Sequence, residues 1–407
     1  MSLQLLTILT AAGGMALVAL THNAYPVYFM LAVLLALVII SFAASRLSPR
    51  SLRWRRRAFD RVFENEEFVL ETQVTNRGRL PHFLLSLADT LPPLLEVAER
   101  DDFVVPVLWP GESVVLPHTV RARKRGVYPL GPLRVWVSDP FGFFQRQAQV
   151  EAPAEAVVYP KPLPVYGELA RTGMEARGMA AGERSRVSES GLDFYGIRDY
   201  RPGDELRRIH WPATGHHNRL TVIEFERGAS ENLAVVLDTA AGTEFGEGVQ
   251  TTLEVAVRAA ASLLHWTLNS EGVAFLATDS PTGPSWLAID RPDREYEALE
   301  VLARVQANTS LPPSILLEWA AHNLGPGANI AVVTSSPDRD LPAAISMLCQ
   351  RHMRVAVLVL DASSFDPNAA DTTSALGTLE AAGATAVAFR RQSDLGQTLE
   401  RLLIASN

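Results

Sequence analysis

The sequence has 407 residues, which is long enough for two or three domains. Its formal net charge of -8 at pH 7 argues against a protein that binds nucleic acid over its whole surface. The single cysteine, Cys349, excludes an internal disulfide and suits a reducing compartment.

The chain begins with two apolar stretches, Leu3–Leu20 and Val27–Ala44. Each is close to the ~20 residues that a helix needs to cross a bilayer. Only residues 21–26 separate them, so residues 1–45 are predicted to form a transmembrane helical hairpin. A cleavable signal peptide is the alternative for the first stretch, but no basic residue precedes Leu3 and a second stretch follows.

A run of arginines follows the second apolar stretch: Arg46, Arg50, Arg53, Arg55, Arg56, Arg57 and Arg61. Basic residues next to a span gather on the cytoplasmic side, so both termini are predicted to lie in the cytoplasm. Residues 46–57 are predicted to be a basic juxtamembrane segment that faces anionic lipid. A nucleic-acid-binding arm is the alternative, but the position beside a span favours lipid.

Residues 58–158 are predicted to form a β-sandwich. Glu67–Thr75 alternates apolar and polar residues, which is the period of a half-buried strand. Further short strands are predicted between Gly and Pro turns at Phe83–Ala88, Phe103–Leu108, Ser113–Val120 and Leu133–Val137. The carboxylates of this domain are scattered along the sequence and form no catalytic pattern. The domain is therefore predicted to act as a spacer or as a binding domain. Residues 159–190, rich first in Pro and then in Gly, Arg and Glu, are predicted to be a linker and mobile loop.

The most distinctive stretch is Gly191–Glu226, at the start of the predicted segment 191–230. Pro202 and Gly203 predict a tight turn, because Pro fixes φ at one central position and Gly permits a positive φ at the next. Asp204 is placed to cap a short helix over residues 205–210, which also carries Arg207. A salt-bridged connector is one interpretation of this segment, and a docking surface is the other, because arginine and aromatic residues are enriched at binding hot spots.

The pattern from Gly191 to Trp211 resembles the signature of the domain-of-unknown-function 58 family. The matching residues are Gly191, Phe194, Arg198, Tyr200, Pro202, Gly203, Asp204, Arg207, Ile209 and Trp211. The pattern departs from the family at His210, where Asp is usual, at Pro212, where a basic residue is common, and at Gly215-His216 in place of Ala-Arg.

The resemblance implies a bacterial or archaeal membrane-anchored protein with a von Willebrand factor A-like (vWA-like) C-terminal domain. It implies the bacterial inner membrane as the location, and a MoxR-type AAA+ ATPase as the protein partner. The residues expected to bind the partner are Arg198, Tyr200, Pro202, Gly203, Asp204, Arg207 and Trp211.

Residues 231–407 are predicted to be an α/β domain with a mostly parallel, Rossmann-like sheet, because apolar strands alternate with helices. The predicted strands are Leu233–Asp238, Val273–Ala277, Ile330–Thr334, Val355–Leu360 and Ala384–Phe389. The predicted helices lie around residues 249–264 and at Tyr296–Val305, Ile315–His322, Leu341–Arg351, Ala375–Ala382 and Leu395–Ile404.

Ligands of such sheets bind at the carboxyl ends of the strands, where Asp238 and Thr239 lie. A vWA metal site would begin D-x-S-x-S here, but both serine positions are replaced, by Ala240 and Gly242. Asp238 and Thr239 are therefore the only candidate ligands of a degenerate Mg²⁺ site, and no cofactor is expected. The alternative role of Asp238 is to cap the loop that follows it.

Three functions compete. The leading one is a membrane-tethered cytoplasmic scaffold that binds a protein partner in the assembly or maturation of envelope-associated complexes. The second is a metal-dependent enzyme that uses Asp204, His210 and Asp238. A separate candidate metal site would combine His210, His216 and His217 with Asp204, but histidine clusters in a polar loop are more often surface residues and no cysteine supports a site here. The third is a receptor that senses a ligand through the β-sandwich. No P-loop, G-x-S-x-G or H-E-x-x-H motif is present in the sequence.

Overall fold

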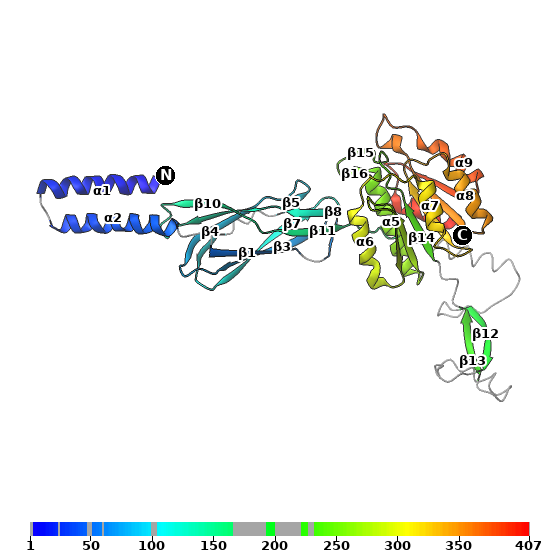
Figure 1. The fold of residues 1–407 in the computed structure, drawn as a ribbon, viewed down its shortest axis with the longest axis horizontal. Coiled ribbons are helices and arrows are strands. Elements are labelled where there is room, and N and C mark those ends of the chain that lie inside the picture. Colours follow the sequence, from blue (N-terminus) through cyan, green and yellow to red (C-terminus); the bar gives the residue numbers. More distant parts are fainter. Residues whose placement is uncertain are drawn as a thin grey trace. The chain divides into compact units, whose positions relative to one another are not determined.

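The computed structural model describes residues 3–22, 25–46, 51–58, 61–98, 104–165, 193–199, 221–226 and 232–406. The chain divides into two compact units, Met1–Pro160 and Lys161–Asn407. The expectation of a multidomain chain with helical, all-β and α/β parts is therefore confirmed (Figure 1).

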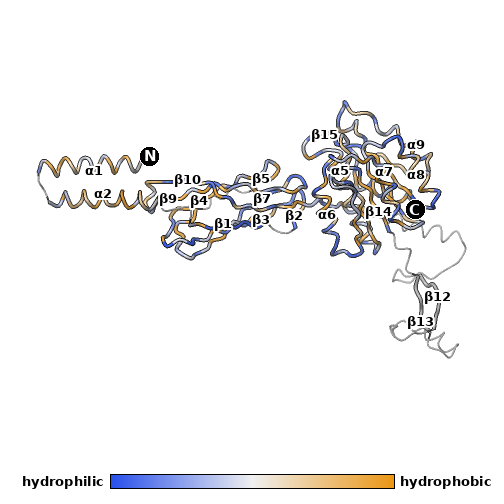
Figure 2. The backbone as a smooth tube through the Cα atoms, in the orientation of Figure 1, coloured by the Kyte–Doolittle hydropathy of each residue, from blue (hydrophilic) through white to orange (hydrophobic). Residues whose placement is uncertain are grey.

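The first unit begins with helices α1 (Leu3–His22) and α2 (Tyr25–Arg46), which lie side by side (Figure 1). Among the described residues, one helix segment, Tyr25–Ala43, is long and apolar enough to cross a membrane, with a mean hydropathy of 2.6. The apolar part of α1, Leu6–His22, is shorter. Figure 2 shows both helices as predominantly hydrophobic. An N-terminal membrane anchor is thus supported by one helix, and the two-pass hairpin stays a prediction.

The rest of the first unit is built from strands that pair antiparallel, except for the short parallel pair of β2 with β11. One four-stranded sheet has the order β1-β3-β7-β5 and a second has the order β10-β9-β4-β6, while β2, β11 and β8 form a smaller sheet. The strands are β1 (Leu52–Ala58), β2 (Val62–Phe63), β3 (Glu67–Asn76), β4 (His82–Asp89), β5 (Leu95–Val97), β6 (Val104–Leu108), β7 (Ser113–Ala122), β8 (Gly126–Leu130), β9 (Leu133–Ser138), β10 (Gln145–Val150) and β11 (Ala154–Tyr159).

The two four-stranded sheets enclose a common core, as the period-2 pattern predicts. Leu52, Val74 and Leu116 come from the first sheet, and they pack in one buried cluster with Leu85 and Val135 of the second. In β3 every second side chain is buried, which matches the alternation in the sequence. The sheets therefore form a sandwich.

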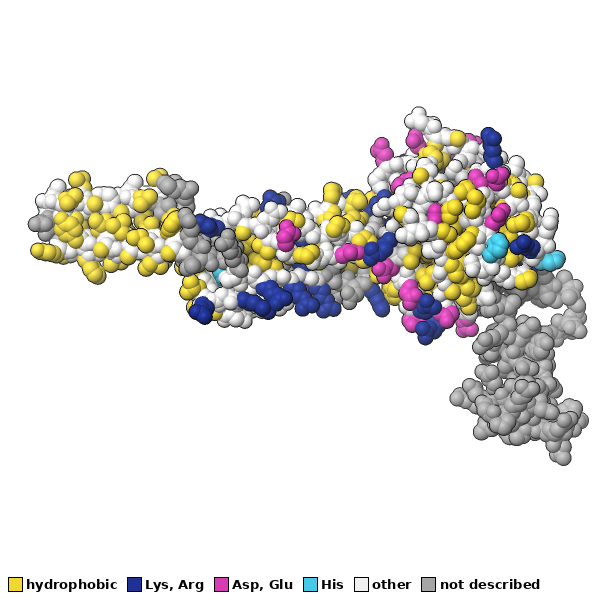
Figure 3. All heavy atoms as spheres, in the orientation of Figure 1, with side chains coloured by type: hydrophobic (Ala, Val, Ile, Leu, Met, Phe, Trp, Pro, Cys, Tyr) yellow, Lys and Arg dark blue, Asp and Glu magenta, His cyan; other side chains and the backbone are white. Residues whose placement is uncertain are grey.

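The start of the sandwich differs from the predicted boundary at residue 58. Strand β1 occupies Leu52–Ala58, most of which the sequence assigns to the basic juxtamembrane segment, and pairs along its length with β3. Arg53, Arg55 and Arg57 point outward, and dark blue side chains run along this part of the molecule in Figure 3. Arg56 instead points inward, and its side chain is fully buried. At the other end, strand β11 extends through Tyr159, which is the first residue of the predicted linker, and it pairs with β8 and β2.

The second unit is an α/β domain around a sheet of the order β18-β17-β14-β19-β20-β21. All strand pairs in this sheet are parallel except β17 with β18. The strands are β14 (Leu233–Leu237), β17 (Ala274–Thr278), β18 (Ser285–Ile289), β19 (Asn329–Thr334), β20 (Arg354–Leu360) and β21 (Thr385–Phe389), with a small ladder of β15 (Gly246–Glu247) and β16 (Gln250–Thr251).

Helices cover both faces of this sheet. The α-helices are α5 (Thr252–Asn269), α6 (Glu295–Arg304), α7 (Pro313–Ala321), α8 (Leu341–Gln350), α9 (Leu376–Ala381) and α10 (Leu395–Ser406), with 3₁₀ turns η3 (Pro292–Arg294), η4 (Ala362–Ser364) and η5 (Thr372–Ala375). Helices α7, α8 and α9 share one buried cluster with alternate side chains of β14, β19 and β20. Helices α5, α6 and α10 pack together separately from that cluster, and α5 and α10 contact the sheet. The predicted strands and helices are confirmed here, and the edge strand β18 was missed.

The segment between the sandwich and this sheet is described only in part. Strand β12 (Asp193–Asp199) pairs with β13 (Thr221–Glu226) in an antiparallel ladder with an irregular register between Phe194 and Gly196. The Pro-Gly turn, the short helix predicted after it and the mobile loop predicted before residue 190 lie outside the described residues.

Candidate functional site

The described candidate site lies at the carboxyl edge of the α/β sheet, where the loops after β14 and β19 meet. Asp238 directly follows β14 and is 4% exposed. One carboxylate oxygen accepts a hydrogen bond from the backbone N–H of Ala240 at 3.0 Å, and the other accepts from the hydroxyl of Thr334 at 2.6 Å. Asp238 therefore fastens the loop that follows it to the end of β19, which is the capping role that the sequence left open.

Thr239 turns away from Asp238 into a second set of hydrogen bonds. Its hydroxyl lies 3.1 Å from the Thr309 hydroxyl and donates to the backbone carbonyl of Asp279 at 3.3 Å. Thr309 donates in turn to the Thr239 carbonyl at 2.8 Å, and its backbone forms a bridge with Ala240. Asp238 and Thr239, the two candidate metal ligands from the sequence, therefore form hydrogen bonds with different partners.

Asp338 is the second carboxylate at this edge. It accepts hydrogen bonds from the backbone N–H and the hydroxyl of Ser314, and so caps the start of α7. Hard cations such as Mg²⁺ want several oxygens in fixed geometry, whereas these carboxylates already accept from protein donors. Within the described ranges, no group of three or more His, Cys, Asp or Glu side chains is placed to hold a metal ion. Metal binding therefore stays untested.

The electrostatics of this edge follow from burial. Loss of water raises the pKa of the Asp238 carboxyl above its ordinary value of 3.8. Hydrogen bonds from Thr334 and Ala240 act in the opposite direction, and the negative charge of Asp338 raises the pKa further. The balance favours a carboxyl group that holds its proton above the usual range.

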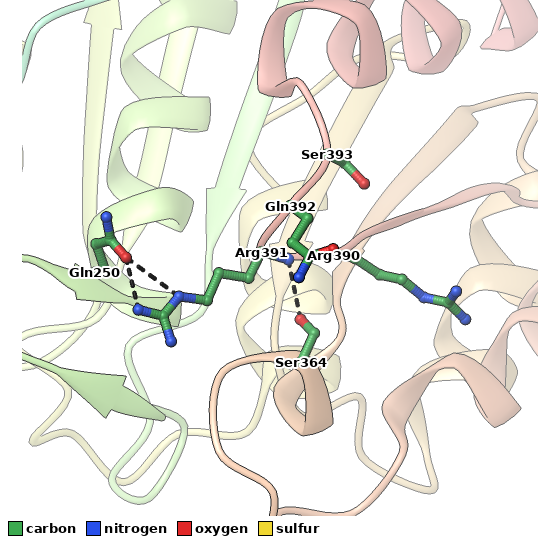
Figure 4. A pocket seen from close by; sticks show the side chains of 6 residues that line it. All are labelled: Gln250, Ser364, Arg390, Arg391, Gln392 and Ser393. Atoms are coloured by element: carbon green, nitrogen blue, oxygen red, sulfur yellow. Dashed lines mark hydrogen bonds between the residues drawn. The ribbon is translucent and has the colours of Figure 1, made fainter.

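A polar pocket at the same edge was missed by the sequence analysis. Its lining residues are Gln250, Ser364, Arg390, Arg391, Gln392 and Ser393 (Figure 4). The Arg391 guanidinium donates two bonds to the Gln250 amide oxygen, at 2.6 and 3.2 Å, and its backbone N–H donates to the Ser364 hydroxyl. Arg390 points the other way and forms an ion pair of 3.3 Å with Asp361. The sequence did contain a signal for this pocket. Arg390 and Arg391 directly follow β21, and ligands of parallel sheets bind at the carboxyl ends of the strands.

The residues of the predicted partner-binding signature are mostly outside the described part. Arg198 lies on β12, and only its backbone is described. Tyr200, Pro202, Gly203, Asp204, Arg207 and Trp211 lie outside the described residues, as does His210 of the enzyme alternative. Their proximity to Asp238 is therefore untested.

Comparison with protein families gives one match. The model of the family described as "Protein of unknown function DUF58" matches residues 196–395, from within β12 to the first residue of α10. The match therefore includes the signature from Gly196 onward and nearly all of the α/β domain.

Comparison with individual proteins gives a relative without an assigned activity. The uncharacterized protein YeaD of Bacillus subtilis (strain 168) is 27% identical over 285 residues, which cover 68% of this chain and 67% of YeaD. Among solved structures, trypsin-activated alpha-2-macroglobulin from Escherichia coli is 16% identical, with a TM-score of 0.22 over 40% of this chain and 10% of that one. A CARDB domain from Pyrococcus furiosus is 17% identical, with a TM-score of 0.19 over 28% and 96%. Similarity this low carries no argument about function.

Proposed function

We propose a function for this chain, which belongs to the DUF58 family of proteins of unknown function: it is a membrane-tethered cytoplasmic scaffold that binds a protein partner. The apolar segment Tyr25–Ala43 supplies the tether. Strand β1 starts at Leu52, so the first folded domain follows the tether after only a few residues. A partner held by this chain would work close to the bilayer.

The observation that carries the scaffold proposal is that the Asp238 and Asp338 carboxylates at the carboxyl edge of the α/β sheet accept hydrogen bonds from neighbouring segments of the domain. Asp238 joins the loop after β14 to β19, and Asp338 caps α7. These bonds give the edge a fixed shape, which suits a surface for a macromolecule. The sheet with helices on both faces is also compatible with the vWA-like domain that the family resemblance implies.

The partner-binding segment in this proposal is residues 191–230, with Arg198 and Arg207 as its charged contacts. A guanidinium fork pairs bidentately with a carboxylate, so the partner would present acidic side chains. A MoxR-type AAA+ ATPase is the partner that the family resemblance implies, and assembly or maturation of an envelope-associated complex is the process.

The test is binding of the detergent-solubilised full chain to a purified MoxR-type ATPase from the same genome. We expect Arg207→Ala to weaken binding at least about tenfold, the scale of a 1.4 kcal/mol contact, while the melting temperature changes little. Asp204→Asn should lower both the affinity for the partner and the melting temperature, because it removes the charge that favours a helix N-terminus. Arg291→Ala is the matched control, because Arg291 is an exposed arginine of the α/β domain at a distance in sequence from the signature.

Two results would decide against the docking surface. If Arg207→Ala melts far below the wild type, the arginine is structural. If Arg291→Ala weakens binding as much as Arg207→Ala, the attraction is a general charge effect and the signature has no special part in it.

The tether makes a separate prediction about topology. Both termini should face the cytoplasm, because arginines follow the second apolar helix and a short loop joins the two helices. Reporter fusions at Asn407 and before Leu3 should be active only when the reporter works in the cytoplasm. A fusion at Asn407 that is active only outside the cytoplasm would contradict this orientation.

A further inference from the structure

The strand registers of the sandwich bring three loops to one end of the domain. Residues 77–81 connect β3 to β4, residues 109–112 connect β6 to β7, and residues 139–144 connect β9 to β10. The pairs at this end are Leu52 with Asn76, Thr75 with Ser113, His82 with Leu108, Phe83 with Ser138, and Ser138 with Gln145. Leu52 is the first residue of β1, so the three loops, here called the anchor-end loops, lie where the chain enters from α2.

Each anchor-end loop exposes a large apolar side chain. Leu80 is 51% exposed, Trp109 is 59% exposed and Phe141 is 49% exposed. Isolated exposed apolar residues are normal on a protein surface, but several at one end of a domain mark an interaction surface. Trp is also enriched where proteins meet the interface between lipid and water.

The loops are held in fixed conformations, so this exposure is built into the fold. The buried Asn76 side chain donates to the carbonyls of Leu80 at 2.8 Å and Leu108 at 3.0 Å, which ties the first loop to the start of the second. The Asn76 carbonyl also accepts from the Gly111 N–H at 2.8 Å.

The third loop is organised by Asp139, which is 1% exposed. Its carboxylate accepts from the backbone N–H groups of Phe141 at 3.0 Å and Phe144 at 2.6 Å. Gly142 supplies a φ of 72° at the tip of the turn. The rings of Phe141 and Phe143 stack with centroids 5.6 Å apart, so the turn presents a paired aromatic surface.

A contact with α2 indicates how close this turn lies to the hydrocarbon of a bilayer. The Phe144 ring packs edge-on against Phe42, with centroids 5.5 Å apart and an interplanar angle of 72°. Phe42 is the second-last residue of the apolar segment Tyr25–Ala43. When that segment spans a bilayer, Phe42 lies at the boundary of the hydrocarbon, and a ring touching it lies at the same boundary.

Basic residues accompany the apolar ones. Arg77 and Arg79 are exposed on the loop that carries Leu80, and Arg146 is exposed at the start of β10. The nearby Glu112 carboxylate is occupied by the Trp109 backbone N–H at 2.8 Å. Arginines beside Trp, Leu and Phe match a surface of anionic lipid, which attracts basic residues that lie next to a membrane span.

From this arrangement we propose that the anchor-end loops are a second membrane contact, which inserts Leu80, Trp109 and Phe141 into the interface of an anionic bilayer. The inference rests on the proposed membrane tether and adds to it. A flexible tether would let the sandwich swing freely, whereas this contact holds one end of the sandwich against the lipid.

The test measures lipid proximity in the full chain, reconstituted into vesicles of phosphatidylethanolamine and phosphatidylglycerol. Cys349→Ser removes the one native cysteine, and single cysteines then replace Leu80, Phe141 or Val97 and carry an environment-sensitive fluorophore. Val97 is the matched control, because it is 43% exposed and pairs with Val120 near the end of β7, at the opposite end of the sandwich. A quencher attached to the lipid acyl chains should reduce fluorescence at positions 80 and 141 at least about twofold more than at 97.

The outcomes separate the two proposals. If the chain fails to float with the vesicles, the tether itself is wrong. If the chain floats but positions 80 and 141 are quenched no more than position 97, the tether stands and the second contact is overturned. Labels that are shielded from aqueous iodide but not quenched by lipid would indicate a protein neighbour, such as a second copy, and would also overturn it.

The choice of anionic lipid is tested with charge variants. Arg77→Gln with Arg79→Gln, or vesicles of phosphatidylcholine alone, should lower the quenching at position 141 toward that at position 97. Unchanged quenching in both cases would overturn the role of anionic headgroups.

Discussion

Replacing Asp89 by alanine is expected to destabilise the sandwich by about 3–5 kcal/mol. Asp89, at the end of β4, forms an ion pair with Arg56 of β1, and the two side chains are 3% and 0% exposed. Because β1 and β4 belong to different four-stranded sheets, this ion pair links the two sheets. Arg56 also donates to the Gly131 carbonyl, between β8 and β9, at 2.7 Å. Burial lowers the pKa of Arg56 to about 10, which still leaves the side chain charged at neutral pH. Without Asp89 this charge has no counterion.

Hydrogen exchange of the solubilised full chain is the suitable measurement, because it reports opening of each domain separately. Amides in β1 and β4 should lose protection in Asp89→Ala, while those in β14 and β19 should not. Arg121→Ala is the control, since its ion pair with Glu67 at 2.6 Å is about half exposed and contributes about 0–1 kcal/mol. Equal losses in the two variants would mean that the buried pair is no more important than a surface pair.

A double variant separates the ion pair from the packing around it. Replacing Arg56 by Met and Asp89 by Leu together removes both charges and keeps apolar volume. Such replacements of buried pairs are often neutral or stabilising, so the double variant should be more stable than Asp89→Ala. If both variants are equally unstable, the shape of the site matters and the unpaired charge does not.

Arg56 also shows why strand β1 was not predicted from the sequence. Composition alone makes residues 46–57 look like a uniformly basic segment, and a basic run is usually solvated. Leu52, Trp54 and Arg56 nevertheless share the period of 2 that marks the inner face of a strand, with Arg53 and Arg55 on the outer face. Charge masked the alternation, because an arginine on an inner face needs a buried partner that only the folded chain supplies.

The α/β domain was predicted more completely, because its buried strands read as apolar runs and amphipathic helices lie between them in the sequence. The edge strand β18 was the exception: its side chains are mostly half-buried, so Ser285–Ile289 carries no strong pattern. At the carboxyl edge, the position of Asp238 after β14 could be predicted from the sequence. Its partner Thr334 lies far along the chain and could not be, because strand order brings the two together.

The bond between Thr334 and Asp238 gives the second large expected effect. Thr334→Val should cost about 1.5–3 kcal/mol once the Asp238 carboxyl group has lost its proton, which is the range for a hydrogen bond to a charged group. The variant keeps the shape of the side chain but removes the hydroxyl that donates to the Asp238 carboxylate at 2.6 Å. That hydroxyl also accepts from the Ser336 N–H at 3.0 Å, so part of the loss comes from this second bond. Thr334→Ser, which keeps the hydroxyl, is the matched control.

The pH dependence identifies the carboxylate as the group involved. Because the folded state raises the pKa of Asp238 above 3.8, it holds the proton more tightly than the unfolded state does. The free energy of unfolding should therefore fall as the pH rises from about 3.8 through the raised pKa, by at most about 1.4 kcal/mol per pH unit. Asp238→Asn should remove this slope.

In Thr334→Val, the fall in the free energy of unfolding should continue to a higher pH than in the wild type. The Thr334 hydroxyl normally lowers the pKa of Asp238 by stabilising the charged form, and the variant removes it. The cost of the variant should thus grow as the carboxyl group loses its proton, and Thr334→Ser should follow the wild type. Exchange rates of the β14 and β19 amides, measured across this pH range, would show the difference. A cost of Thr334→Val that is the same when the Asp238 carboxyl group is protonated and when it is ionised would place the loss in the Ser336 bond or in packing. The edge would then owe its fixed shape to contacts other than the Asp238 carboxylate.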